Sequence, residues 1–210
     1  MLSKEKIDKY LEILGREIFI NFGPSANIPM VIVGGAAIAV NYTFRESTMD
    51  IDTYMNNSAA LESLVSKIAK EHNLEDDWLN SNVMVTQSFT ANIGKYAKTY
   101  KTFSGVLHVR VADSLTLICM KSVCCRPDSH DLLDVASILD EDSSITYDDI
   151  CERFVDLYGD WSKMSVDAQI YLQGRFQCYV TPDMFDLLPP SMLAKAETFA
   201  EKMELCRRFC

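Results

Sequence analysis

Residues 31–52 have the sequence VIVGGAAIAVNYTFRESTMDID, and this stretch decides the fold. Met30 to Val33 is a short, β-branched apolar run, which predicts a buried strand that ends at Gly34-Gly35. Residues 36–42 then predict a short helix with small side chains on its packing side. Apolar and polar residues alternate over residues 48–54, which predicts a second strand beside the first.

Asp50 and Asp52 are separated by one apolar residue in this second strand. Residues i and i+2 of a strand share a face, about 6.5–7 Å apart at Cα. Both carboxylates are therefore expected on one face, with Ile51 pointing into the core. Two carboxylates on one face suit Mg²⁺ that is also bound to a triphosphate. Asp has low strand propensity, so two of them on one strand face need a reason.

The glycine turn and Arg45 have the properties of a phosphate site. Glycines let the backbone approach a phosphate closely, and the N-terminus of the following helix directs N–H groups at it. Arg45 lies just before the acidic strand, where its guanidinium could contact phosphate oxygens. A Gly-Gly pair or an Asp-x-Asp alone is usually a turn or a solvated strand face. A Gly-Gly turn after a strand, followed at this spacing by Asp-x-Asp, is a more specific indication of a phosphate and metal site than either motif alone.

The rest of the chain predicts an α+β core followed by helices. Residues 3–22 and 58–72 have apolar side chains at helical spacing, and residues 82–90 and 105–111 have strand-like composition. After an acidic linker at residues 140–144, helices are expected at 147–159, 165–175, 182–188 and 191–208.

The predicted fold class is therefore α+β, a small mixed sheet flanked by helices, with a helical C-terminal region. The expected domains are residues 1–140 and the helical region 141–210. Residues 95–103 interleave lysines with aromatic residues. We favour a hairpin whose lysines protect a sheet edge over a local nucleotide or RNA contact.

Charge and cysteine content limit the partners. The net charge of −10 disfavours tight, non-specific binding of nucleic acid. No apolar run has the length of a membrane span, and the N-terminus lacks the apolar core of a signal peptide, so no membrane partner is expected. The seven cysteines include no CxxC, which argues against a zinc site and a disulfide framework. A cytoplasmic location with reduced thiols is expected.

This pattern resembles the nucleotidyltransferase superfamily related to DNA polymerase beta, and within it a bacterial branch that includes abortive-infection toxins. The resemblance rests on the Gly-Gly turn followed by Arg-x-x-Thr-x-Asp-x-Asp, here Arg45, Thr48, Asp50 and Asp52. Two later segments are also similar to that branch, Trp78-Leu79-Asn80 and the run from Lys121 to Asp134. The resemblance covers about residues 30–140.

The resemblance implies that Asp50 and Asp52 hold Mg²⁺ and that the glycines cradle the triphosphate of an NTP. The residues expected to bind the nucleotide are Gly34, Gly35, Arg45, Thr48, Lys121, Arg126 and Asp131, and those expected to act in catalysis are Asp50, Asp52 and Lys121. For Asp131 and Asp134 the alternative is a helix surface with ion pairs.

The function that this resemblance implies is Mg²⁺-dependent transfer of a nucleotide to a hydroxyl acceptor, which is a protein, a small molecule or a tRNA. A cognate toxin or antitoxin is the implied partner. Many superfamily members carry a third carboxylate on a neighbouring strand, but no Asp or Glu occurs between Trp78 and Asp113. His108 and Arg110 are at candidate positions for it. The alternative is therefore a non-catalytic nucleotide-binding or interaction module that retains the fold.

Overall fold

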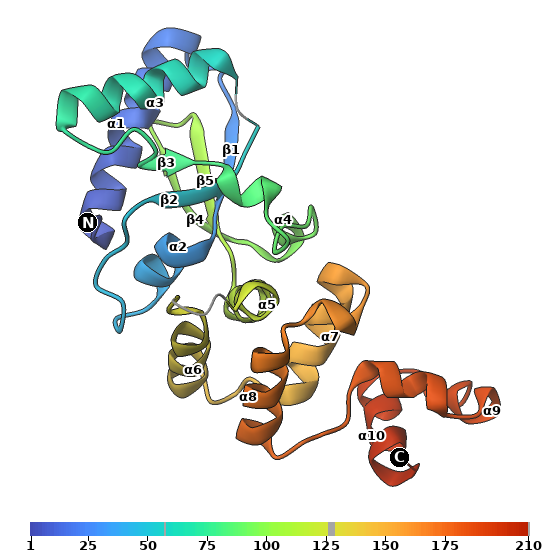
Figure 1. Ribbon diagram of the computed structural model, residues 1–210. Coiled ribbons are helices and arrows are strands. Elements are labelled where there is room, and N and C mark those ends of the chain that lie inside the picture. Colours follow the sequence, from blue (N-terminus) through green and yellow to red (C-terminus); the bar gives the residue numbers. More distant parts are fainter. Residues whose placement is uncertain (57, 126–128, 210) are drawn as a thin grey trace. The chain divides into compact units, whose positions relative to one another are not determined.

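The computed structural model describes residues 1–56, 58–125 and 129–209. It divides into two compact units, Met1–Asp113 and Ser114–Cys210 (Figure 1). The first unit contains a mixed sheet with helices, and the described residues of the second form helices. The predicted α+β class with a helical C-terminal region is confirmed. The domain boundary between residues 140 and 141 rests on the acidic linker and stays a prediction.

The described strands of the first unit form one sheet in the order β3-β2-β1-β5-β4. They are β1 (Ile28–Ile32), β2 (Ile51–Tyr54), β3 (Leu79–Asn80), β4 (Lys98–Phe103) and β5 (Leu107–Val111). Strand β1 is antiparallel to β2 and parallel to β5, whereas β2 is parallel to β3. Strand β2 therefore has β1 on one side and β3 on the other. Strand β4 pairs with β5 and forms one edge.

The two faces of this sheet differ in polarity. Cross-strand partners share a face, and on one face Ile32 is paired with Thr53 and Val111, all three of them buried. On the other face Val31 is paired with Tyr54 and Arg110, which are only half-buried. One face therefore belongs to the core, and the opposite face carries polar side chains.

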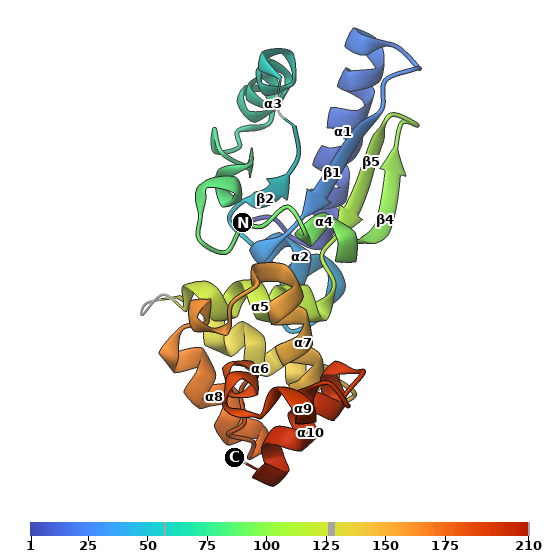
Figure 2. The same cartoon turned by 90° about the vertical axis from the view of Figure 1, so that its right-hand side faces the viewer.

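Helices surround the sheet of the first unit. They are α1 (Lys4–Phe22), α2 (Gly34–Asn41), α3 (Ala59–His72) and the short α4 (Ile93–Tyr96), with a 3₁₀ turn η1 at Asn82–Val85. Helix α1 lies along β4 and β5 (Figure 2). This close approach depends on Gly15, because a Cβ there would lie 2.9 Å from Phe103 Cβ. Ser3 and Ser58 cap α1 and α3 by accepting backbone N–H groups.

The second unit is built from α5 (Ser114–Cys124), α6 (Asp131–Glu141), α7 (Tyr147–Tyr158), α8 (Val166–Phe176), α9 (Pro190–Leu193) and α10 (Phe199–Phe209), with 3₁₀ turns η2 (Trp161–Lys163) and η3 (Pro182–Leu187). Helix α7 begins with a capping box in which Thr146 and Asp149 each accept a backbone N–H of the other. Phe154 packs against Tyr158 and Trp161 at the centre of the unit. None of the helices in the described part of the chain combines the length and apolar character that a membrane crossing needs.

Three expectations need correction. The second strand begins at Ile51 rather than at Thr48, which forms only an isolated bridge with Leu2. Residues 82–90 form no strand, because the Asn82 N–H bonds the Asn80 side chain and the chain turns into η1. The helix expected over 191–208 is interrupted between α9 and α10. There the Glu201 carboxylate accepts the N–H groups of residues 197 and 198 and starts a new helix.

The lysine-rich segment contributes an edge strand to the sheet, as expected if its lysines protect that edge. Residues 98–103 form β4, an edge strand of the sheet, with Lys98 and Lys101 exposed. Exposed lysines on an edge strand discourage pairing with another chain. The hairpin interpretation is confirmed for residues 98–103, whereas Lys95 and Tyr96 lie in the short helix α4. A nucleotide or RNA contact of this segment remains untested.

Candidate functional site

The glycine turn lies against the carboxylate of Asp52. The Val33 N–H donates to the Asp52 carbonyl oxygen over 3.0 Å, which ties the end of β1 to β2. Gly34 then adopts φ +60°, a conformation that side chains disfavour. A Cβ on Gly34 would lie 2.9 Å from Asp52 Oδ2. Position 34 therefore requires glycine for two separate reasons, its backbone conformation and its closeness to a carboxylate.

The second glycine is covered by Arg45 and Thr48. A Cβ on Gly35 would lie 2.9 Å from Thr48 Oγ1 and 3.0 Å from Arg45 Nη2. Thr48 is held in place by two backbone hydrogen bonds with Leu2, of 2.7 and 3.0 Å. Gly34 and Gly35 are also the first residues of α2, whose N-cap residue Val33 provides no side-chain cap. The structure thus brings a helix N-terminus, a guanidinium and a hydroxyl to the same turn.

Asp50 and Asp52 flank the side chain of Asn80. Asn80 is the register partner of Asp52 between β2 and β3, and its Nδ2 donates to Asp50 Oδ2 over 3.2 Å. Both aspartates are half-buried, whereas Ile51 between them is fully buried. The sequence predicts that half-buried and buried side chains alternate here. This alternation includes Asp50, although Asp50 precedes the first residue of β2.

His108 and Arg110 do not lie beside the aspartates. Both are on the polar face of the sheet, but their strand β5 pairs with β1 and β4 and not with β2. The Arg110 guanidinium donates to the Ala97 carbonyl oxygen. The strands beside β2 are β1 and β3, and on β3 the register partner of Asp52 is Asn80. The prediction that residues 106–111 form the strand beside the two aspartates is therefore wrong, because β1 lies between β5 and β2.

Asn80 is the site residue to which the sequence assigned no role. The signal that could have identified it is its order in the chain. A strand with Asp-x-Asp, a helix and then a short apolar pair form a β-α-β unit. Such a unit makes the two strands parallel neighbours when they pair. Asn80 ends the second of these strands, on the level of Asp52.

Asp50 and Asp52 suit Mg²⁺ in its usual protein setting. This ion takes one or two carboxylates from the protein and completes its shell with phosphate oxygens and water. Asn80 donates a hydrogen bond to one of the two carboxylates. Across residues 1–56, 58–125 and 129–209, no group of three or more His, Cys, Asp or Glu side chains is placed to hold a metal ion.

Lys121, Asp131 and Asp134 form a buried cluster in the second unit. Lys121 Nζ lies 2.6 Å from Asp131 Oδ1 and 2.9 Å from Asp134 Oδ2. The two aspartates are 2% and 4% exposed. The ion pairs of the alternative interpretation are therefore present, but they are buried and do not lie on a helix surface. Arg126 lies outside the described residues.

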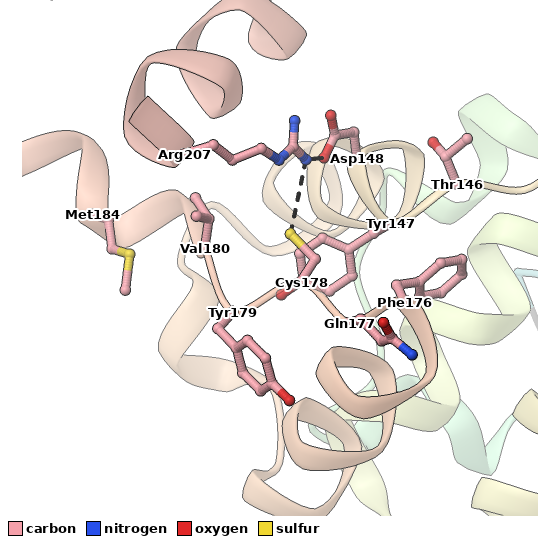
Figure 3. A pocket seen from close by; sticks show the side chains of 10 residues that line it. All are labelled: Thr146, Tyr147, Asp148, Phe176, Gln177, Cys178, Tyr179, Val180, Met184 and Arg207. Atoms are coloured by element: carbon pink, nitrogen blue, oxygen red, sulfur yellow. Dashed lines mark hydrogen bonds and ion pairs between the residues drawn. The ribbon is translucent and has the colours of Figure 1, made fainter. Parts of the chain in front are cut away.

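A cavity of about 620 Å³ in the second unit contains none of the predicted site residues (Figure 3). Its charged groups, Asp148 and Arg207, form an ion pair, and Arg207 also donates to Cys178 Sγ over 3.9 Å. The Tyr147 hydroxyl is buried, and this burial raises its pKa. Thr146, Gln177 and Tyr179 also line this cavity.

Residues 13–149 match the model of a family described as a nucleotidyltransferase of unknown function (DUF6036). The chain belongs to this family. The match includes the glycine turn, both aspartates and Asn80, and it extends through Lys121, Asp131 and Asp134 in the second unit. Nucleotidyl transfer is therefore the general function of this DUF6036 member. No curated protein and no solved structure matches the chain.

Proposed function

We propose that this DUF6036 protein transfers a nucleotide from an NTP to a hydroxyl acceptor at the Gly34-Gly35 turn. The observation that carries the proposal is the close approach of Asp52 Oδ2 to Gly34, where even a Cβ would be 2.9 Å away. A carboxylate this near a glycine turn brings a metal ligand within reach of a phosphate bound at that turn. Asp50 and Asp52 are the proposed ligands of Mg²⁺.

The turn has the groups that a triphosphate requires. Its glycines leave the backbone accessible, and the start of α2 directs N–H groups and a positive partial charge outward. Arg45 and Thr48 lie over Gly35, where they provide a cation and a hydroxyl. A guanidinium matches phosphate geometry better than a lysine ammonium does.

The overall reaction breaks the phosphoanhydride bond between the α- and β-phosphates of the NTP and forms a phosphoester bond to the acceptor. The oxygen of the acceptor hydroxyl attacks the α-phosphorus, the bond from that phosphorus to the bridging oxygen breaks, and pyrophosphate leaves with the bond electrons. The acceptor proton passes to solvent or to a basic group. When bound, Mg²⁺ supplies charge neutralisation of the triphosphate and of the pyrophosphate that leaves. Asp50 and Asp52 would hold it, and Arg45 would orient the phosphates.

The acceptor is proposed to be a protein side chain or a small molecule ahead of a tRNA. The net charge of −10 opposes a broad contact with nucleic acid. Membership of the superfamily related to DNA polymerase beta, and a role as a toxin–antitoxin component, are supported by the motif resemblance of Arg45, Thr48, Asp50 and Asp52. Lys121 and Asp131 are proposed to assist nucleotide binding on the same basis.

The test is transfer of label from an α-³²P NTP, offered as each of the four nucleotides, to components of a cell lysate with Mg²⁺ or Mn²⁺. Wild type is expected to give labelled product, and Asp50→Ala and Asp52→Asn none. Asp76→Ala is the matched control, because Asp76 is exposed and lies outside the site. Product formed by Asp52→Asn at a rate close to that of wild type would contradict the proposal. A structural role for the Asp pair predicts instead that Asp52→Asn leaves metal and nucleotide affinity unchanged.

A second candidate, a nucleotide-binding module without transfer, is favoured by one observation. The position beside Asp52 on the neighbouring strand holds the amide of Asn80, which cannot accept a proton as a carboxylate does. This candidate predicts NTP binding, measured by equilibrium dialysis, that depends on Asp52 while no acceptor becomes labelled. The labelling experiment therefore separates the two functions.

A further inference from the structure

The side chain of Asn80 is fixed by hydrogen bonds in three directions. Its Nδ2 donates to Asp50 Oδ2 over 3.2 Å and to the Asp77 carbonyl oxygen over 3.1 Å. Its Oδ1 accepts the Asn82 N–H over 2.8 Å. The donors and the acceptor of the amide are therefore assigned by their partners, and the orientation is not arbitrary.

The backbone of Asn80 is fixed as well. It pairs with Asp52 across β2 and β3, and its carbonyl oxygen accepts the Thr53 Oγ1 hydroxyl over 2.8 Å. Thr53 is fully buried, so this bond lies within the core. A side chain held at its backbone and at both ends of its amide can hold another group in place.

We propose that Asn80 is a positioning residue, which orients the Asp50 carboxylate for the metal through its Nδ2–H donor. This inference rests on the proposed function. A carboxylate at position 80 could accept the Asn82 N–H, but it would repel both Asp50 and the Asp77 carbonyl oxygen. Only an amide satisfies the three partners together. The residue opposite Asp52 thus acts on the metal site through Asp50 rather than as a ligand or a base.

The test measures Mn²⁺ binding to the full chain, without nucleotide, by the loss of the EPR signal of the free ion. Removing a partner that orients a metal ligand typically weakens metal binding about 10-fold or more. Asn80→Ala is expected to raise the Kd for Mn²⁺ about 10-fold. Asn82→Ala is the matched control, since Asn82 is exposed and contributes its backbone N–H to the Asn80 side chain. It is expected to bind Mn²⁺ as wild type does.

A second variant covers the case in which Asn80→Ala fails to fold. Asn80→Ser keeps an oxygen that can accept the Asn82 N–H in the equivalent turn, but its side chain is too short to bring a donor to Asp50. It is expected to show the same loss of Mn²⁺ affinity while its circular dichroism spectrum matches that of wild type.

A double-mutant cycle shows whether Asn80 acts through Asp50. In the Asp50→Ala background, replacing Asn80 by Ser is expected to change the Kd for Mn²⁺ no further. If Asn80→Ser binds Mn²⁺ as wild type does, or weakens binding equally in both backgrounds, the inference is overturned while the proposed function stands. If wild type binds no Mn²⁺, or Asp50→Ala and Asp52→Asn bind it normally, the proposed function fails and the inference with it.

Discussion

The chain contains two pairs of aspartates that look alike in sequence and differ in structure. Asp50 and Asp52 lie two residues apart at a strand, are half-buried, and lie beside a glycine turn and an asparagine amide. Asp131 and Asp134 lie three residues apart in α6, are almost fully buried, and both contact Lys121. The first pair is partly exposed to solvent. The second pair is buried against the Lys121 ammonium.

This difference shows what separates a binding site from an ion cluster. A buried carboxylate without a cation is costly, so Asp131 and Asp134 need Lys121 for the unit to fold. A half-exposed carboxylate keeps part of its hydration, so its charge is less costly than a buried one. Changes in the first pair should therefore act mainly on activity, and changes in the second pair mainly on stability.

The largest effect is expected for Asp52→Asn, which should lower transfer of label about 1,000-fold, since losing the metal's charge stabilisation costs roughly 4 kcal/mol. Its thermal unfolding midpoint should stay near that of wild type. Asp134→Asn, the matched change in the other pair, should lower the midpoint and keep most of the transfer per folded molecule. If folded Asp134→Asn loses transfer as completely as Asp52→Asn, both pairs belong to the chemistry.

The next largest effect is expected for Lys121→Met. It leaves two buried aspartates without their cation, so the free energy of unfolding should fall by about 3–5 kcal/mol, measured by denaturation in urea. The triple variant that also carries Asp131→Asn and Asp134→Asn removes the charges together and should recover most of the loss. A triple variant no more stable than Lys121→Met would show that charge burial is not the cause.

The sequence predicted the glycine turn, the alternation around Ile51 and the gathering of Arg45 and Thr48 near that turn. These features are local, because residues 31–52 place them within one strand–helix–strand unit. Sheet order is not local. The position of β5 beside β1 rather than β2 depends on pairing between residues about 80 apart in the chain. The prediction that His108 and Arg110 lie on the strand beside the two aspartates is wrong for this reason.

Asn80 and the buried state of Asp131 were missed for related reasons. The role of Asn80 depends on three partners that its own side chain selects, and no periodic pattern reports them. Asp131 and Asp134 begin a helix whose apolar pattern predicts burial only for its apolar residues. Their burial follows from the position of Lys121 on α5, ten residues earlier than Asp131.

A moderate effect is expected for Gly34→Ala. The left-handed backbone costs an alanine about 1–2 kcal/mol, and its Cβ would displace Asp52 Oδ2, which lies 2.9 Å away. Unfolding free energy should fall by that amount and transfer by about 10-fold. Gly174→Ala in α8 is the control, since nothing lies within 4 Å of its added Cβ. It should stabilise the chain by about 0.5–1 kcal/mol. Normal transfer in Gly34→Ala would contradict the close contact on which the site depends.

The smallest effect is expected for Asp8→Asn, which tests a third Lys–Asp arrangement on the surface. Lys101 Nζ lies 2.6 Å from Asp8 Oδ2, as close as Lys121 is to Asp131, but these side chains are 48% and 26% exposed. The asparagine oxygen can still accept the Tyr100 hydroxyl that Asp8 binds, so the variant removes mainly charge. The unfolding free energy should fall by about 1 kcal/mol or less.

Salt gives this prediction its control. At 1 M NaCl the Debye length is about 3 Å, so the difference between wild type and Asp8→Asn should nearly vanish, whereas the cost of Lys121→Met should persist because its carboxylates are buried. A loss above about 2 kcal/mol that resists salt would mean that contact distance, and not burial, sets the strength of these pairs. Burial would then not explain why the two aspartate pairs differ in their expected effects on stability.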